Sequence, residues 1–127
     1  MILLYIAVGG ALGSVCRYLL GNALHRPGEF PTGTLVVNVL GSLLVGFVVR
    51  LALETTHVSP EARAFLAVGF CGGFTTFSTF AWELLALGEQ GAWGRAALYL
   101  ALSITLSLVA CVAGMAAARE TALALHR

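Results

Sequence analysis

The chain has 127 residues, of which 59% are hydrophobic and only 10% charged, and its mean hydropathy of +0.93 exceeds that of ordinary soluble domains. Seven Arg and six Glu give a formal charge of +1, so there is no basic tract that could hold nucleic acid. The three Cys lie in apolar stretches without a C-x-x-C spacing, which predicts neither a disulfide framework nor a zinc site. We therefore expect an integral membrane protein without a nucleic-acid partner.

Four apolar stretches are long enough to cross a bilayer, which takes about 20 helical residues. They predict spans at about 2–24, 30–53, 63–87 and 94–118, joined by links too short to fold alone. We expect the first span to be retained rather than cleaved as a signal peptide, because no basic residue precedes it and Arg17 interrupts it. The prediction is one all-α domain over 1–127 with four transmembrane helices.

The first two spans contain glycines that let helix backbones approach closely in lipid. The second span also contains Asn38, with Ser42 one turn later on the same face. An amide in hydrocarbon needs several partners or a polar surface, so we expect Asn38 to face a polar path or another helix.

The third span differs from the others because its middle, residues 69–80, is rich in glycine and hydroxyl side chains. Gly72 and Gly73 either allow a close helix crossing or permit a local unwinding that frees carbonyl oxygens. Thr75 and Thr76 follow directly, and their hydroxyls can replace lost backbone partners. This favours unwinding, and a break from Gly72 to Thr75 is predicted.

Four phenylalanines in the same span recur at helical spacing and would share one stripe of a regular helix: Phe70, Phe74, Phe77 and Phe80. The stripe is either a packing surface or a set of ring edges, which carry a partial positive charge and can face an anion. In the fourth span Ser103 and Ser107 share one face, and each either bonds its own helix or lines a polar path.

No Asp, Glu or His is expected deep in a span, since Glu54 and Glu83 are placed near helix ends. A proton relay, an intramembrane protease and a metalloenzyme all need such groups, so no enzyme is predicted.

The arginines are nearly balanced between the two sides of the membrane. Arg50, Arg63, Arg119 and Arg127 are predicted on the side of the amino terminus, against Arg26, Arg95 and the deeper Arg17 on the other. Arginine bias sets orientation, so four against three predicts that the chain can insert either way up.

Four segments of the sequence resemble the Fluc/CrcB family of fluoride channels. They are Gly9-Gly10-Ala11-Leu12-Gly13 with Arg17-Tyr18, Pro31-Thr32-Gly33-Thr34-Leu35-Val36-Val37-Asn38, Gly69 to Phe80, and the fourth-span residues Tyr99, Ser103 and Ser107. The resemblance implies a passive channel that exports fluoride across a bacterial or archaeal plasma membrane. It also implies a dimer of oppositely oriented four-helix subunits, with two fluoride pathways at the interface.

The resemblance further implies roles for individual residues. Asn38 would donate its amide to the anion, Phe77 and Phe80 would offer ring edges, and the polar track would be lined by Thr79, Ser103, Ser107 and Tyr99. The carbonyls of Gly72 and Thr75 from both subunits would hold a structural sodium ion. Arg17 would lie at the mouth, where it either reaches the interface or steers anions.

Two other functions match part of the sequence. A small dual-topology proton-coupled exporter matches the length and charge balance but needs a carboxylate inside a span. A non-transporting membrane subunit explains the small residues but not Asn38 or the hydroxyl-rich break. Whether the partner is an identical chain or a second subunit stays open at this point.

Overall fold

The computed structural model describes residues 1–25 and 28–125, and the regular structure of these residues is helical. The elements are α1 (Ile2–Leu24), α2 (Thr32–Glu54), α3 (Pro60–Arg63), η1 (Ala64–Cys71), α4 (Gly72–Phe74), α5 (Phe77–Glu89) and α6 (Trp93–Leu125). Among the described residues, four helical stretches are long and apolar enough to cross a membrane, the third being Pro60–Glu89 with its internal break. The predicted all-α fold with four spans and a broken third span is confirmed.

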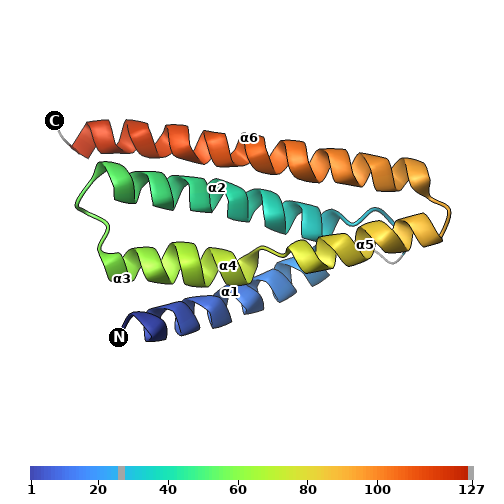
Figure 1. Ribbon diagram of the computed structural model, residues 1–127, viewed down its shortest axis with the longest axis horizontal. Coiled ribbons are helices and arrows are strands. Elements are labelled where there is room, and N and C mark those ends of the chain that lie inside the picture. The colour runs from blue at the N-terminus through green and yellow to red at the C-terminus, as the bar shows by residue number, and fades with distance from the viewer. Residues whose placement is uncertain (26–27, 126–127) are drawn as a thin grey trace.

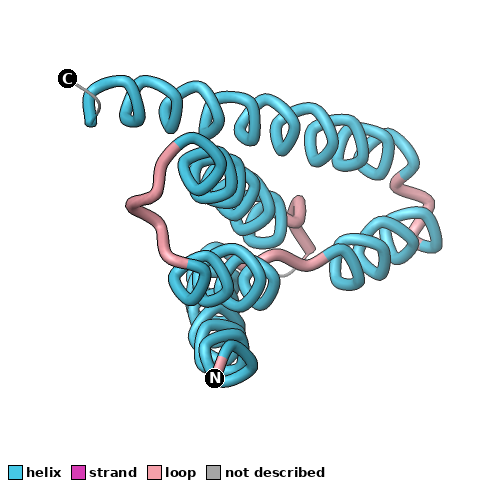
Figure 2. Tube along the Cα trace, turned by 60° about the vertical axis from the view of Figure 1, so that its left-hand side comes forward, coloured by secondary structure: helices cyan, strands magenta, loops and turns pink. Residues whose placement is uncertain are grey.

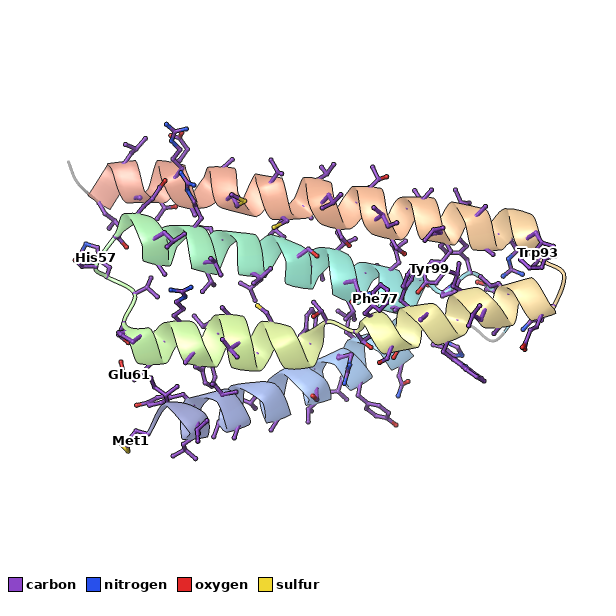
Figure 3. The ribbon with its side chains drawn as sticks, viewed as in Figure 1. Met1, His57, Glu61, Phe77, Trp93 and Tyr99 are labelled. Carbon is purple, nitrogen blue, oxygen red and sulfur yellow. The ribbon has the colours of Figure 1, made fainter. Side chains whose placement is uncertain are left out.

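The spans run up and down in chain order, so both termini lie at the same end of the bundle (Figure 1). Helix α2 packs along α6, while α1 packs along η1 and α4. Figure 2 shows the loop that separates α4 from α5 within the third span. Met1, His57 and Glu61 lie at one end of the bundle and Trp93 at the other (Figure 3).

Glycines set the closest helix contacts. A Cβ on Gly13 of α1 would lie 2.9 Å from the Phe74 nitrogen, and a Cβ on Gly73 would lie 3.0 Å from the Gly10 Cα. On the other side of the bundle a Cβ on Gly114 of α6 would lie 2.9 Å from the Phe47 nitrogen of α2. These backbones can approach only because no side chain intervenes.

The first half of the third span is a π-helix, η1, which the sequence analysis did not predict. Its turn is wider than that of an α-helix, with hydrogen bonds to the fifth residue along, and its buried residues are Ala64, Gly69 and Cys71. The α-helical period therefore does not describe this part of the span, and a packing stripe counted in threes and fours is misplaced there.

The break lies later than predicted. Gly72 and Gly73 are helical, in α4, and the backbone becomes extended at Thr75 (φ −77°, ψ 157°) and Thr76 (φ −151°, ψ 114°). The prediction that the glycines themselves unwind was wrong, because Gly73 is needed for the close crossing with α1. The two threonines break the helix instead.

The fourth helix also differs from its expected bounds, since α6 runs to Leu125 rather than ending at 118. The short helix α3 begins with an ordinary side-chain cap. The Ser59 hydroxyl accepts from the Ala62 N–H at 3.1 Å before α3, with Pro60 in the first turn.

Candidate functional site

The side chain of Asn38 in α2 forms hydrogen bonds with the backbone at the break in the third span. Its Nδ2 donates to the Thr76 carbonyl at 3.0 Å, and the Thr76 N–H donates to Asn38 Oδ1 at 2.8 Å. The side chain thus satisfies both backbone groups of a buried extended residue. In a continuous helix the Thr76 N–H would bond the Gly72 carbonyl, so this pairing takes away the Gly72 carbonyl's usual helical partner.

The threonine hydroxyls complete the break. Thr75 Oγ1 donates to the Cys71 carbonyl at 2.9 Å, and Thr76 caps α5 by accepting from the Thr79 N–H at 3.2 Å. The Thr79 N–H is the group that would otherwise bond the Thr75 carbonyl. The carbonyls of Gly72 and Thr75 have therefore both lost their partners in the helix.

Helix α1 supplies two donors to carbonyls beside the break. Ser14 Oγ donates to the Gly73 carbonyl at 3.5 Å, and Arg17 Nη1 donates to the Thr75 carbonyl at 3.4 Å. Arg17 therefore reaches the break in the third span, which is a contact that the two roles considered in the sequence analysis did not include.

Two cavities meet at the break. One, of about 420 Å³, we call the phenylalanine cavity; it is lined by Asn38, Ser42, Val45, Ala67, Cys71, Gly72, Thr75, Thr76, Phe77, Phe80, Ser103, Ile104 and Ser107. The other, of about 450 Å³, we call the arginine cavity; it is lined by Ser14, Arg17, Tyr18, Gly21, Asn22, His25, Pro31, Gly33, Thr34, Val37, Thr76, Thr79 and Glu83. Thr76 lines both cavities, so the extended segment lies between them.

The phenylalanine cavity is lined by neutral side chains only. Ser103 Oγ is buried there, and it has no hydrogen-bond partner among residues 1–25 and 28–125. Phe77 is 80% exposed and Phe80 only 7%, with their ring centroids 5.5 Å apart. Figure 3 shows Phe77 at the start of α5, directly after the break.

Glu83 was placed near a helix end by the sequence analysis, and this was wrong. It lies within α5, where its Oε1 accepts from Thr34 Oγ1 at 2.9 Å and its Oε2 from the Tyr99 hydroxyl at 2.6 Å. The available signal was the presence of Thr34 and Tyr99, two further polar groups in neighbouring spans.

The predicted site residues are distributed over both cavities. Asn38, Gly72, Thr75, Phe77, Phe80, Ser103 and Ser107 line the phenylalanine cavity, and Arg17 and Thr79 line the arginine cavity. Tyr99 lines neither of them: it is fully buried behind Phe80, with ring centroids 5.1 Å apart. Thr76 and Glu83 belong to the site and were not among the predicted residues.

Arg50 and Arg95 make contacts near the ends of their helices. Arg95 donates to the Gly28 carbonyl at 3.1 Å, and Arg50 Nε donates to Glu54 at 2.7 Å. Arg26 and Arg127, which entered the predicted charge balance, lie outside the described residues.

Within residues 1–25 and 28–125 there is no group of three or more His, Cys, Asp or Glu side chains that could hold a metal ion. A cation at the break would be held by neutral oxygen atoms, among them backbone carbonyls. The carbonyls of Gly72 and Thr75 are of the right chemical kind, since hard cations prefer oxygen ligands, and both residues line the same cavity.

The sequence matches the family model described as CrcB-like protein, Camphor Resistance (CrcB), over residues 4–115. A relative from Ruegeria sp. (strain TM1040), named fluoride-specific ion channel FluC, is 50% identical over 121 residues, which cover 91% of this chain and 93% of that protein. Relatives with the same name from Geobacter sulfurreducens and Methanopyrus kandleri are 48% and 46% identical. They cover 93% and 89% of this chain, and 97% and 86% of their own.

Proposed function

This chain belongs to the CrcB family, and on that premise we propose that it is a fluoride-specific ion channel of the bacterial or archaeal plasma membrane, through which fluoride leaves the cytoplasm passively. The observation that carries the proposal is the phenylalanine cavity, a hollow beside a broken membrane-spanning helix that is lined by donors but by no charged side chain.

The donors of this cavity suit a small anion. The Ser103 hydroxyl has no partner among the described residues, and Asn38 uses one amide hydrogen on Thr76 and keeps a second. Helix α5 begins at Phe77 on the cavity wall, so the positive end of its dipole lies there. Neutral donors can replace the water around fluoride without holding the ion too tightly to leave.

We infer that fluoride passes between the two cavities at the break. Arg17 raises the local anion concentration in the arginine cavity, and Thr79 offers its hydroxyl beside Thr76, where the cavities meet. Beyond the break the ion meets the ring edges of Phe77 and Phe80 and then the hydroxyls of Ser103 and Ser107. Tyr99 supports this path from behind, through its contact with Phe80.

A second copy of the chain is part of the proposal. Phe77 is 80% exposed and the neighbouring polar residues Ser78 and Thr79 are also exposed, although they lie inside a span. Polar residues exposed to hydrocarbon are unfavourable, so a partner surface is expected over this face. The nearly balanced arginines favour an antiparallel homodimer with membrane lipid around it.

A structural sodium ion fits this dimer. Each chain supplies the Gly72 and Thr75 carbonyls that have lost their helical partners, so two chains supply four oxygens to one hard cation. When bound, the ion would add a positive charge that holds the subunits together and favours anions in the adjacent cavities.

Glu83 makes the proton-coupled exporter worth a direct test, because such an exporter needs a carboxylate inside a span and Glu83 is one. Both Glu83 oxygens already accept hydrogen bonds, from Thr34 and Tyr99, so the side chain is engaged in contacts between spans. A passive channel moves fluoride without a proton gradient, whereas an exporter of this kind stops when the gradient is collapsed.

Growth of a bacterium that has lost its own fluoride export tests the proposal in cells. Expression of this chain should restore growth in fluoride medium and lower cytoplasmic fluoride, and Asn38→Asp should abolish the rescue. Normal insertion of the parent chain in the membrane without any rescue would favour the non-transporting subunit.

A further inference from the structure

Arg17 brings a permanent positive charge from α1 to the break in the third span. Its Nη1 donates to the Thr75 carbonyl at 3.4 Å, in partly buried surroundings. Arginines inside membranes are costly, and where they occur they are often paired with backbone carbonyls. This carbonyl lies at the carboxyl end of the half-helix formed by η1 and α4, where the helix dipole is negative and a cation is favourable.

The same carbonyl is one of those assigned above to sodium, so the inference rests on the proposed function. A carbonyl oxygen has two lone pairs and can accept from a guanidinium while it also contacts a metal ion. We propose that Arg17 and the sodium ion share the Thr75 carbonyl, and that the charge of Arg17 weakens the binding of sodium.

Arg17 has two opposing effects on sodium binding, and their relative sizes decide whether it strengthens or weakens that binding. Its hydrogen bond orients the carbonyl toward the ion, which would strengthen sodium binding. The distance of 3.4 Å is, however, longer than the roughly 2.7–3.2 Å of well-formed N–H···O bonds, so this orienting contribution is small. Repulsion between two positive charges on one carbonyl is large by comparison, because little water or salt screens it inside the membrane.

Arg17 also lies beside Thr76, where the two cavities meet. The break therefore keeps a positive charge next to the anion path whether or not sodium is bound. Removing that charge should have opposite effects on the two ions: sodium would bind more tightly, and fluoride would be attracted less strongly.

Sodium-dependent thermal stability of the full chain in detergent tests this without measuring flux. The unfolding midpoint is followed as sodium chloride replaces N-methylglucamine chloride at constant ionic strength. Arg17→Gln removes the charge and should lower the half-maximal sodium concentration by about tenfold relative to the parent. Arg17→Lys keeps the charge and should stay within about threefold of the parent.

Arg95→Gln is the matched control, because Arg95 also donates to a backbone carbonyl, that of Gly28, but away from the break. It should leave the half-maximal sodium concentration unchanged. Should Arg17→Gln not assemble, Arg17→Met is a second neutral variant with the same expected shift.

The outcomes separate this inference from the proposed function. A half-maximal concentration that is unchanged or raised in the neutral variants, or lowered equally in Arg17→Lys, would overturn the inference alone. Failure of both neutral variants to assemble, while Arg17→Lys assembles, would also overturn it in favour of a purely structural role. A parent chain without any sodium dependence would overturn the sodium proposal and this inference together, and fluoride flux would still judge the channel separately.

Discussion

Asn38 and Thr76 exchange two hydrogen bonds across the interface between α2 and the third span, at 3.0 and 2.8 Å. The amide replaces the helical partners of an extended residue, and in doing so it diverts the N–H that would bond the Gly72 carbonyl. One side chain thus keeps the break open and takes the helical partner from the carbonyl of Gly72, a residue that lines the phenylalanine cavity.

Asn38 should therefore affect both stability and permeation. Asn38→Ala leaves the Thr76 N–H and carbonyl without partners, at a cost of about 1–3 kcal/mol for each group. Asn38→Asp can still accept from the Thr76 N–H, but it cannot donate to the carbonyl and its charge repels fluoride. We expect Asn38→Asp to suppress fluoride flux in a protein that still assembles.

Ser42→Ala is the matched control, since Ser42 lies one turn from Asn38 on the same cavity wall. Denaturation in detergent and electrode-recorded flux measure the two effects separately. An Asn38→Asp protein that assembles normally and conducts at the parent rate would remove Asn38 from the pathway.

Substitutions of the two neighbouring glycines in α4 should have different effects on folding and on dimer assembly. A Cβ on Gly72 meets no atom of its own chain within 4 Å, whereas one on Gly73 would lie 3.0 Å from the Gly10 Cα and closer to the Gly10 carbonyl oxygen. Gly72→Leu should fold as a chain but lose the dimer and the flux. Gly73→Leu should disrupt the packing of α1 and destabilise the chain itself.

Helical content by circular dichroism and mass by light scattering distinguish these two results. Thr75→Ser keeps the hydroxyl that bonds the Cys71 carbonyl and should retain both dimer and flux. A dimeric, conducting Gly72→Leu protein would contradict the position given to the Gly72 carbonyl.

Tyr99 should matter more for stability than for conduction. Tyr99→Phe keeps the ring against Phe80 but removes the donor to Glu83, and this should cost about 1–3 kcal/mol in unfolding free energy. Flux measured at a temperature where the variant is folded should remain close to that of the parent. Tyr18→Phe, at an exposed position in the arginine cavity, is the control and should change neither quantity. Loss of flux in a fully folded Tyr99→Phe protein would instead place the hydroxyl on the pathway.

Dual topology can be tested in the link between α5 and α6. Gln90 is exposed and, unlike Gly91 with its φ of 72°, can be replaced without backbone strain. In a background with Cys16, Cys71 and Cys111 replaced, Gln90→Cys should be labelled by an impermeant thiol reagent from both sides of the membrane. Labelling from one side alone would contradict antiparallel assembly.

The spans and the need of Asn38 for polar partners could be predicted, because both depend on the cost of transferring groups into hydrocarbon. Uncharged apolar length identifies a span whatever its neighbours are, and a lone amide is expensive wherever it lies. The third span was predicted to be broken because its threonine hydroxyls can replace the backbone partners that a broken helix loses.

The position of the break could not be predicted, because it depends on contacts between spans. Gly73 stays helical since α1 packs against it, and the helix ends only where Asn38 from α2 reaches Thr76. The π-helix before it has no signature in composition, and it changes which residues share a face. The contacts of Glu83 could not be predicted for the same reason, because they come from Thr34 and Tyr99 on other spans.

Fluoride efflux from liposomes that contain only this purified chain tests the central claim most directly. The vesicles are loaded with equal concentrations of fluoride and chloride, their membrane is made permeable to potassium, and no proton gradient is applied. They should release fluoride rapidly and retain chloride. The Asn38→Asp protein, reconstituted at the same density, should retain both ions. Equal release of the two anions, or no release from a parent chain shown to be assembled in the vesicles, would contradict a self-sufficient fluoride channel.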